Sequence, residues 1–509
     1  MPVVAGVDSS TQSCTVELRD AVDGTLLGSG RAPHPPTFPP VSEQPATTWW
    51  TAFVTALPAA LADAATRGTP VPPASIGAIS VAGQCHGLVM LDAAGQVLRD
   101  VKLWNDTTSA PQAAALVAEL GAAGWAEAVG SVPTAAFTIT KLAWVAEHEP
   151  QLLRRLATVL LPHDYLTYRL TGRTVTDRSE AAGTAYYAAH ERRWRTDLLT
   201  RFVDADLDWA TMLPTVLGPA EPAGTLIPDV ARQLGLRPDV VVGPGAGDQH
   251  AGALGLGIRS GEVVYSLGTS GVVLTTTEDP VHDASGWVNG VADAAGGYLP
   301  LVSVLNCAKV TDTFARLLGV DHDELARLAL GAPDNPDRPV LAAFLDGERS
   351  PDRPRARGAL AGLTTATTRE ELALAAVEGV LLALVRGHER LRTAGAPADG
   401  DVLVTGGAAR SAAYRQVLAD LLGTPVRTCD APEATARGAC LQASAVLAGT
   451  DVRQVRDAWR PATLTVTEPR TPARPDVRDR YARLADWDGL DSPVDPSADP
   501  PVDNLEDFA

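Results

Sequence analysis

The chain has 509 residues, of which 45% are hydrophobic and 20% charged, a composition typical of folded chains with two large or three ordinary domains. Its formal net charge of −19 argues against nucleic acid or an anionic membrane surface as the main partner. Such an acidic chain can bind phosphate only through backbone N–H groups, local cations or a metal, so its glycine-rich turns are of interest.

The five cysteines are scattered and include no CxxC pair, which argues against a disulfide framework or a zinc site. The first residues, MPVVAGVDSS, lack the basic region of a signal peptide. No run of about 18 apolar residues is present, so no membrane span is predicted. These features predict a cytoplasmic protein.

The first predicted element is an apolar strand, residues 3–7, which ends at Asp8. A turn with Ser10 and Thr11 joins it to a second strand, residues 14–18. Backbone N–H groups in such a turn can form an anion site, to which the hydroxyls can add. Similar patterns predict strands at residues 25–29 and 402–404 and helices at residues 47–67, 371–386 and 432–444.

Two polar clusters follow in the first half of the chain. A buried strand, residues 76–81, leads into the loop GQCHG, which contains Cys85 and His86, and the later cluster LWNDTT contains Asn105 and Asp106. Amide, carboxylate and imidazole groups beside a tryptophan suit a polyhydroxylated ligand. The alternatives are a structural histidine and a turn with a packed tryptophan.

The stretch of residues 241–257, VVGPGAGDQHAGALGLG, presents a single carboxylate in a loop of small residues. Its glycines allow a ligand to approach the backbone closely, and Asp248 could accept a proton from a substrate hydroxyl. The alternative is that Asp248 only caps a helix, a position that aspartate favours. The local sequence does not separate these two interpretations.

The second half of the chain repeats the pattern of the first. A strand at residues 262–266, the turn LGTSG with Thr269 and Ser270, and a return strand at residues 272–276 match the strand–turn–strand pattern at the N-terminus. We expect the two turns to face each other with phosphates between them. A further loop with Gly406, Gly407 and Ala408 lies between a strand and a helix, a common seat for a nucleotide.

Several longer patterns resemble the FGGY carbohydrate kinases. They are KLAW at residues 141–144, GALAGL at residues 358–363 and the helix residues EL and AAVE at 371–372 and 375–378. The resemblance implies an α/β protein with the two-domain sugar kinase/actin/heat-shock-type (ribonuclease H-like) fold and a cleft between the domains. It further implies a sugar-binding domain at residues 1–243, a nucleotide-binding domain at 244–485 and an acidic, Pro-rich tail at 486–509, which we expect to be disordered.

Within that family, GQCHG, LWND, LPHDYL, DGERSP and SLGTSG are similar to the group that phosphorylates D-xylulose. The resemblance implies that Asp248 is the catalytic base, that Asp8 lies near the metal and phosphates, and that Cys85 and His86 contact the sugar. Cys85 stands where that group usually has Met, and Gln249, which would also lie beside the sugar, stands where it has Asn. Another ketose or a polyol, such as ribulose or a pentitol, is therefore an alternative substrate.

The resemblance also implies ATP and Mg²⁺ as cofactors. Phosphates would bind between Ser10–Thr11 and Thr269–Ser270, adenosine on residues 406–408, and the sugar at Asn105 and Asp106. The predicted partners are therefore a small sugar and ATP, without nucleic acid or membrane, and a homodimer is implied by resemblance alone. Two further alternatives are a sugar- and ATP-binding sensor without catalysis and a nucleotide-dependent conformational protein of the same fold.

Overall fold

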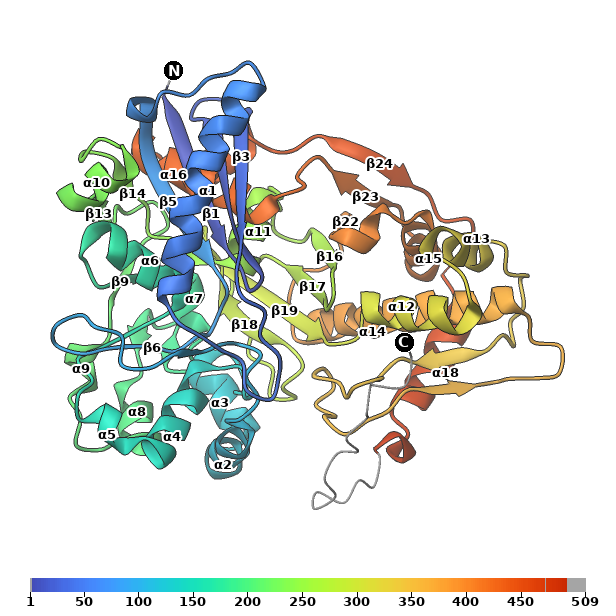
Figure 1. The fold of residues 1–509 in the computed structure, drawn as a ribbon. Helices are drawn as coiled ribbons and strands as arrows, with labels where there is room; N and C mark the ends of the chain where they lie inside the picture. The colour runs from blue at the N-terminus through green and yellow to red at the C-terminus, as the bar shows by residue number, and fades with distance from the viewer. Residues whose placement is uncertain (1, 472, 492–509) are drawn as a thin grey trace, which may run out of the picture.

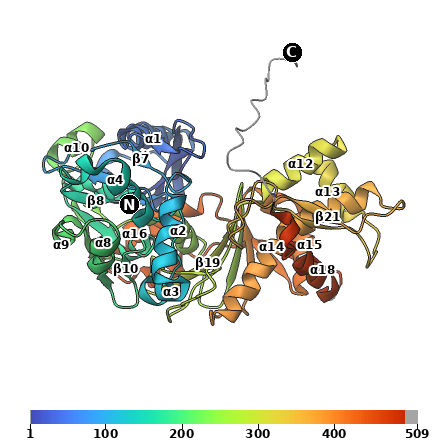
Figure 2. The same ribbon diagram turned by 90° about the horizontal axis from the view of Figure 1, so that it is seen from below.

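The computed structural model describes residues 2–471 and 473–491, which form two lobes (Figure 1). The view from below separates the lobes most clearly (Figure 2). Each lobe is built on a seven-stranded sheet. The first sheet has the order β13 (Gly224–Thr225), β14 (Val241–Val242), β5 (Ile76–Gly83), β1 (Val3–Ser9), β2 (Ser13–Asp20) and β3 (Leu26–Pro33), with β15 (Ala246–Gly247) also paired to β5.

The second sheet repeats this arrangement. Its order is β18 (Asn289–Ala292), β19 (Tyr298–Val304), β17 (Gly271–Thr275), β16 (Val263–Leu267), β22 (Val402–Thr405), β23 (Val426–Cys429) and β24 (Thr463–Thr467). In both sheets an antiparallel hairpin, β1–β2 or β16–β17, pairs in parallel with a strand from later in its lobe, β5 or β22. The repeat inferred from the two turns is therefore present in the topology.

Long helices cover the outer faces of the sheets. In the first lobe α1 (Thr47–Thr66), which contains Pro58, lies so close to β3 that a Cβ on Gly30 would be 2.2 Å from the carbonyl oxygen of Ala56. In the second lobe α14 (Arg369–Thr393) begins with a capping box between Thr368 and Glu371 and buries its apolar face against β17 and β19. Both helices match predicted segments.

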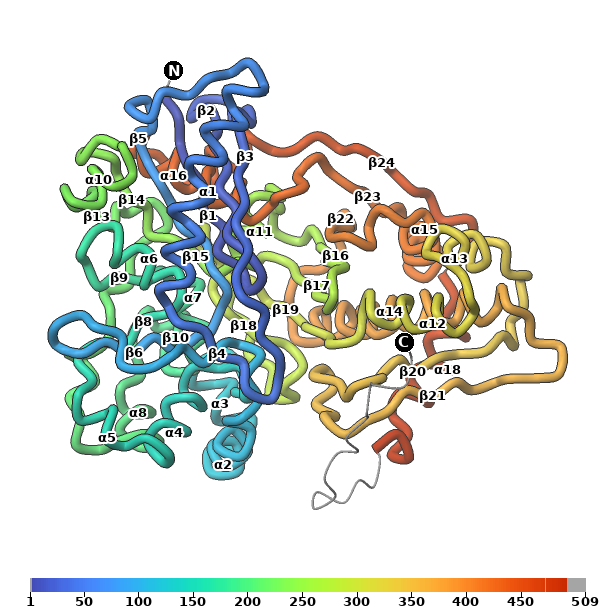
Figure 3. The backbone as a smooth tube through the Cα atoms, in the orientation of Figure 1, coloured from blue at the N-terminus to red at the C-terminus, as the bar shows by residue number. Residues whose placement is uncertain are grey.

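Two helices between the sheets tie the lobes together. Helix α11 (Asp248–Gly255) follows β15 of the first sheet, and α16 (Ala434–Ala448) follows β23 of the second, yet α16 packs against β1 and β5 (Figure 3). The two helices touch so closely that a Cβ on Gly438 would be 1.9 Å from the carbonyl oxygen of Ala251. The C-terminal part of the chain thus supplies part of the first lobe's core.

The remaining helices pack around these two sheets. They are α2 (Ala110–Leu120), α3 (Ala122–Val129), α4 (Thr138–His148), α5 (Pro150–Leu153), α6 (Pro162–Thr171), α7 (Arg178–Ala182), α8 (Thr196–Phe202), α9 (Trp209–Met212), α10 (Pro228–Leu234), α12 (Ala308–Leu318), α13 (His322–Leu330), α15 (Ala412–Leu422), α17 (Val452–Ala458), α18 (Pro475–Ala485) and the 3-10 helices η1 (Pro73–Ser75), η2 (Gly407–Arg410) and η3 (Asp488–Leu490).

Small two-stranded sheets complete the fold, and the last described residues are ordered. The pairs are β4 (Glu43–Gln44) with β7 (Val101–Lys102), β6 (Val89–Leu91) with β8 (Thr158–Leu160), β9 (Val175–Asp177) with β12 (Thr215–Leu217), β10 (Tyr187–Ala188) with β11 (Arg193–Trp194), and β20 (Val340–Ala342) with β21 (Ala359–Ala361). Within the segment assigned to the tail, Leu490 is buried and Asp491 pairs with Arg353 at 2.8 Å. The rest of the predicted tail, residues 492–509, lies outside the described residues.

Candidate active site

Asp248 lies at the start of α11, directly after a short strand. In the parallel pairing of β15 with β5, Gly247 is opposite Gly83, so Asp248 emerges at the carboxyl end of β5. The N-cap of α11 is Gly247, not Asp248. One carboxylate oxygen, Oδ1, accepts the N–H of Gln249 at 2.7 Å, and no residue in the described part of the chain donates to Oδ2. A role in capping the helix therefore accounts for one oxygen of this carboxylate and not for the other.

Asp8 lies on the other side of the same strand. It ends the apolar part of β1 and pairs with Ala82 of β5, which also pairs with Ala246 of β15. Burial raises the pKa of Asp8 to about 7; the Ser10 hydroxyl, which donates to the carboxylate, opposes this rise, and the nearby Asp248 charge adds to it. The β5 carboxyl end thus brings two half-buried carboxylates together.

Burial also raises the pKa of Asp248, to about 6. The N–H of Gln249 and the thiol of Cys85, whose Sγ lies 3.5 Å from Asp248 Oδ1, act in the opposite direction because they stabilise the charged form. A carboxylate with a pKa near 6 is ionised at neutral pH and is a stronger base than an exposed aspartate.

The GQCHG loop is held in a strained conformation. His86 has a φ of 68°, and its backbone N–H donates to Glu180 Oε1 at 2.7 Å. Its Nδ1 lies 2.7 Å from the carbonyl oxygen of Gly183, so Nδ1 carries the proton and Nε2 is left as an acceptor. Burial lowers the pKa of His86 to about 3, which keeps the ring neutral at neutral pH. A neutral imidazole with a free Nε2 can accept a hydrogen bond from a sugar hydroxyl.

Glu180, which no motif identified as a site residue, holds this loop through the hydrogen bond from the His86 backbone. Its side chain is fully buried, and burial raises its pKa to about 8. A Cβ on Gly247 would lie 2.6 Å from Cys85 Sγ and 2.8 Å from Glu180 Oε2, so this carboxyl lies close to Cys85 and to the residue before Asp248. The only sequence signal was the polar loop DRSEAAGT, which indicated a pocket edge but not this contact.

The LWND cluster divides into an available residue and an anchoring residue. The Asn105 side-chain oxygen is buried and lacks a hydrogen-bond partner in the described residues, as a ligand contact requires. In contrast, the Asp106 carboxylate is wholly buried and accepts the backbone N–H groups of Ser42 at 2.9 Å and Thr108 at 3.0 Å. Asp106 therefore holds the loop in this structure.

The adjacent Trp104 links this cluster to the Ser10–Thr11 turn. Its indole Nε1 donates to Thr11 Oγ1 at 2.8 Å. Gln249 is half-buried beside Asp248, and helix α16 approaches the same point, because Thr435 Oγ1 donates to the Asp248 carbonyl oxygen at 3.3 Å. Asp8, Asp248 and the GQCHG and LWND loops thus gather at one end of the first sheet.

The second-domain residues form a group of their own at the end of β16. The turn after Leu267 leaves Thr269 exposed and Ser270 half-buried. The loop at residues 406–408 lies beside it, because a Cβ on Gly406 would be 2.5 Å from the Leu267 carbonyl oxygen. Gly406 has a φ of 90°, which only glycine adopts readily. Gly407 faces open space, as a loop that receives a ligand must.

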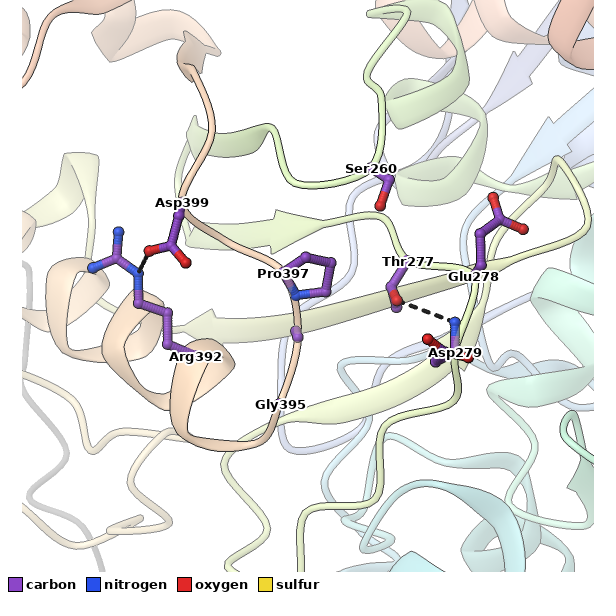
Figure 4. Close-up of a pocket in the computed structure, with 9 residues that line it drawn as sticks. Ser260, Thr277, Glu278, Asp279, Arg392, Gly395, Pro397 and Asp399 are labelled. Atoms are coloured by element: carbon purple, nitrogen blue, oxygen red, sulfur yellow. Dashed lines mark hydrogen bonds and ion pairs between the residues drawn. The ribbon is translucent and has the colours of Figure 1, made fainter.

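A pocket of about 470 Å³ lies elsewhere (Figure 4). It is lined by residues after β17, such as Thr277, and by the end of α14, where Arg392 pairs with Asp399 at 2.8 Å. This is the end of the β16–β17 hairpin opposite the Thr269–Ser270 turn. Because it contains none of the convergent carboxylates, we place the active site at β5 and not in this pocket.

Two features of the described residues concern metal binding and membrane insertion. No group of three or more His, Cys, Asp or Glu side chains is placed to hold a metal ion, so any cation at Asp8 needs other oxygen ligands. Among the helices of residues 2–471 and 473–491, none has the length and apolar character to cross a membrane.

Comparisons with known proteins agree with this architecture. The N-terminal domain of the FGGY family of carbohydrate kinases matches residues 3–255, and its C-terminal domain matches residues 263–447. A xylulose kinase of Streptomyces coelicolor is 41% identical over 463 residues, which cover 91% of this chain and 91% of that protein.

Solved structures show the same fold. The crystal structure of a xylulose kinase from Bifidobacterium adolescentis is 38% identical with a TM-score of 0.83, covering 95% of this chain and 99% of that one. A xylulose kinase structure from Rhodospirillum rubrum is 26% identical with a TM-score of 0.83, covering 95% and 97%. The predicted two-domain sugar kinase fold is confirmed, and the chain belongs to the FGGY family of carbohydrate kinases.

Proposed function

We propose that the chain transfers the γ-phosphoryl group of ATP to the terminal hydroxyl of D-xylulose, giving D-xylulose 5-phosphate and ADP. The observation that carries the proposal is the convergence of Asp8, Asp248 and the GQCHG loop at the carboxyl end of β5. The chain is similar to proteins named xylulose kinase, such as that of Streptomyces coelicolor, and this similarity supports the choice of sugar.

Asp248 acts as the general base. Its carboxylate accepts the proton of the O5 hydroxyl as O5 attacks the γ-phosphorus, and the bond from that phosphorus to the β–γ bridging oxygen breaks. The electron pair of that bond leaves on ADP, so the proton ends on Asp248 and the phosphoryl group on O5. General base catalysis of this kind contributes about 10²–10⁴-fold to a rate.

The phosphates bind between the Ser10–Thr11 turn and the Thr269–Ser270 turn, whose backbone N–H groups suit anions. Asp8 fits a site for Mg²⁺, because its pKa is raised to about 7 by burial and neighbouring carboxylates, a cost that a cation would relieve. Asp8 would hold Mg²⁺ bound with the nucleotide, and the cation would neutralise part of the phosphate charge.

The sugar lies on the first domain. His86 Nε2 and the Asn105 side chain supply free polar atoms, Gln249 flanks the base, and Cys85 contacts the sugar from the same loop as His86. Asp106 contributes by fixing the loop that carries Asn105. Adenosine lies on Gly406, Gly407 and Ala408, of which the two glycines are exposed and Ala408 is half-buried.

A coupled ADP-release assay with MgATP tests the proposal. The panel is D-xylulose, D-ribulose, L-ribulose, L-xylulose, D-fructose, xylitol, D-arabitol and glycerol, and we expect the highest kcat/KM with D-xylulose. Preference for another sugar keeps the mechanism, moves the substrate and makes Cys85 and Gln249 the first positions to exchange. Tight ATP binding without turnover of any sugar contradicts the proposal and favours a sensor.

A further inference from the structure

One side chain of the second lobe reaches the sugar-binding loops of the first. It is Arg349, in the DGERSP segment between β20 and β21. The neighbouring Glu348 fixes the segment, because its carboxylate accepts the Asn306 amide at 2.9 Å and the backbone N–H of Arg349 at 2.8 Å. The Asn306 amide also donates to the Gly347 carbonyl oxygen at 2.8 Å. The Arg349 side chain is thus projected from a rigid base.

The guanidinium of Arg349 lies over the indole of Trp104, with its Cζ 5.5 Å from the ring centroid. Trp104 is itself fixed by its hydrogen bond to Thr11. A contact of this type orients the arginine without using its N–H donors.

Other cations near these loops already have partners. Lys141 Nζ donates to the carbonyl oxygen of Ala135 at 3.0 Å, and Lys102 Nζ lies 2.9 Å from Glu43 Oε1. For Arg349 no side-chain hydrogen bond or ion pair is formed with any of the described residues, although burial lowers its pKa. Arg349 is half-buried and its N–H donors have no protein partner among the described residues, so a ligand that enters the site can accept from them in place of water.

The position of Arg349 indicates which ligand that is. Its guanidinium lies over Trp104, and the side-chain oxygen of the adjacent Asn105 is buried without a partner in the described residues. Arg349 therefore lies against the LWND loop, to which we assign sugar contacts. A ketose whose O5 meets Asp248 extends its C1–C2 end away from that base, towards His86.

We propose that Arg349 is a substrate-binding residue that donates hydrogen bonds to the C1 hydroxyl and C2 oxygen of the ketose. The inference rests on the proposed function and adds a contact from the second lobe to a sugar site otherwise built by the first. Sugar binding and the approach of the two lobes are then linked through one side chain.

Calorimetric titration of the full chain with D-xylulose, alongside the kinetic assay, tests the contact. Arg349→Ala should weaken D-xylulose binding about 10- to 100-fold, the usual range for a hydrogen bond from a charged group, and leave KM for ATP within about twofold. Arg349→Lys should recover part of the loss. The matched control is Arg355→Ala, which removes the same charge from an exposed position in the same segment and should change neither value.

A substrate analogue separates a direct contact from a structural one. Wild type should bind 1-deoxy-D-xylulose less tightly than D-xylulose, and Arg349→Ala should bind the two with nearly equal affinity. If the variant keeps the wild-type preference, or binds D-xylulose as tightly as wild type, the proposal is overturned. Wild type that binds D-xylulose without turnover contradicts the proposed function alone, whereas wild type that binds no D-xylulose overturns both.

Discussion

At the level of single residues, the chemistry depends on one oxygen of Asp248 that the fold leaves free. Asp248→Ala should reduce kcat by about 10²–10⁴-fold, because the proton of the sugar hydroxyl would have no acceptor. D-xylulose affinity, measured by calorimetry, should change little. A variant that keeps more than about a tenth of kcat contradicts the role of base.

The raised pKa of Asp248 predicts a pH dependence of the rate. Below about pH 6 the carboxylate becomes protonated and cannot accept a proton, so kcat/KM should fall as the pH is lowered through that value. Cys85→Ala removes the thiol that stabilises the charged form, so the acid limb should move to higher pH. Cys429→Ala, in β23 of the second lobe, is the control and should leave the limb in place.

Asp8 should affect the metal dependence of the rate. Asp8→Ala removes the carboxylate to which we assign Mg²⁺, so the Mg²⁺ concentration for half-maximal activity should rise at least about tenfold, as for the loss of an interaction worth about 1.4 kcal/mol. The measurement is the initial rate against free Mg²⁺ at constant ATP. An unchanged Mg²⁺ curve would place the cation elsewhere.

At the level of elements, the contact of α11 with α16 has no room for an additional methyl group. Gly438→Ala would place Cβ 1.9 Å from the Ala251 carbonyl oxygen and force the helices apart, lowering the free energy of unfolding by about 1–3 kcal/mol. Gly124→Ala, in α3, meets only the flexible Leu120 side chain and should be neutral or stabilising by up to about 1 kcal/mol. Urea denaturation compares the two; equal effects would contradict the close contact.

Elements with strong local patterns were predictable from the sequence, and their partners were not. Apolar alternation and turn residues located β1, β2, β16 and β17, and helical periodicity located α1 and α14. The packing of α16 against α11 and the first sheet was not predictable. Its only sequence signal is a pattern of small residues, and glycine and alanine suit many close contacts equally well. Its partner surface is set by tertiary packing, which no local pattern encodes.

At the level of the whole molecule, the sequence predicted candidate site residues within each lobe but not the contacts between distant segments. Asp8, Asp248 and His86 stand in motifs with recognisable chemistry. Glu180 and Arg349 reach the GQCHG and LWND loops only because folding brings together segments that are 94 and 245 residues apart in the sequence. The burial of Glu180 and the position of Arg349 over Trp104 are properties of the folded chain, so no local pattern predicts them.

The insertion of α16 into the first lobe constrains how the protein can be made. Val4 and Ala78 at the start of the chain find their apolar partners on Ala439 and Cys440, near its other end. The ribosome must therefore finish almost the entire polypeptide before the first-made lobe can close its core. We expect stalled nascent chains to gain protease resistance in that lobe only after residue 448 has emerged. Until then the nascent chain exposes apolar surface of the incomplete core, to which chaperones can bind.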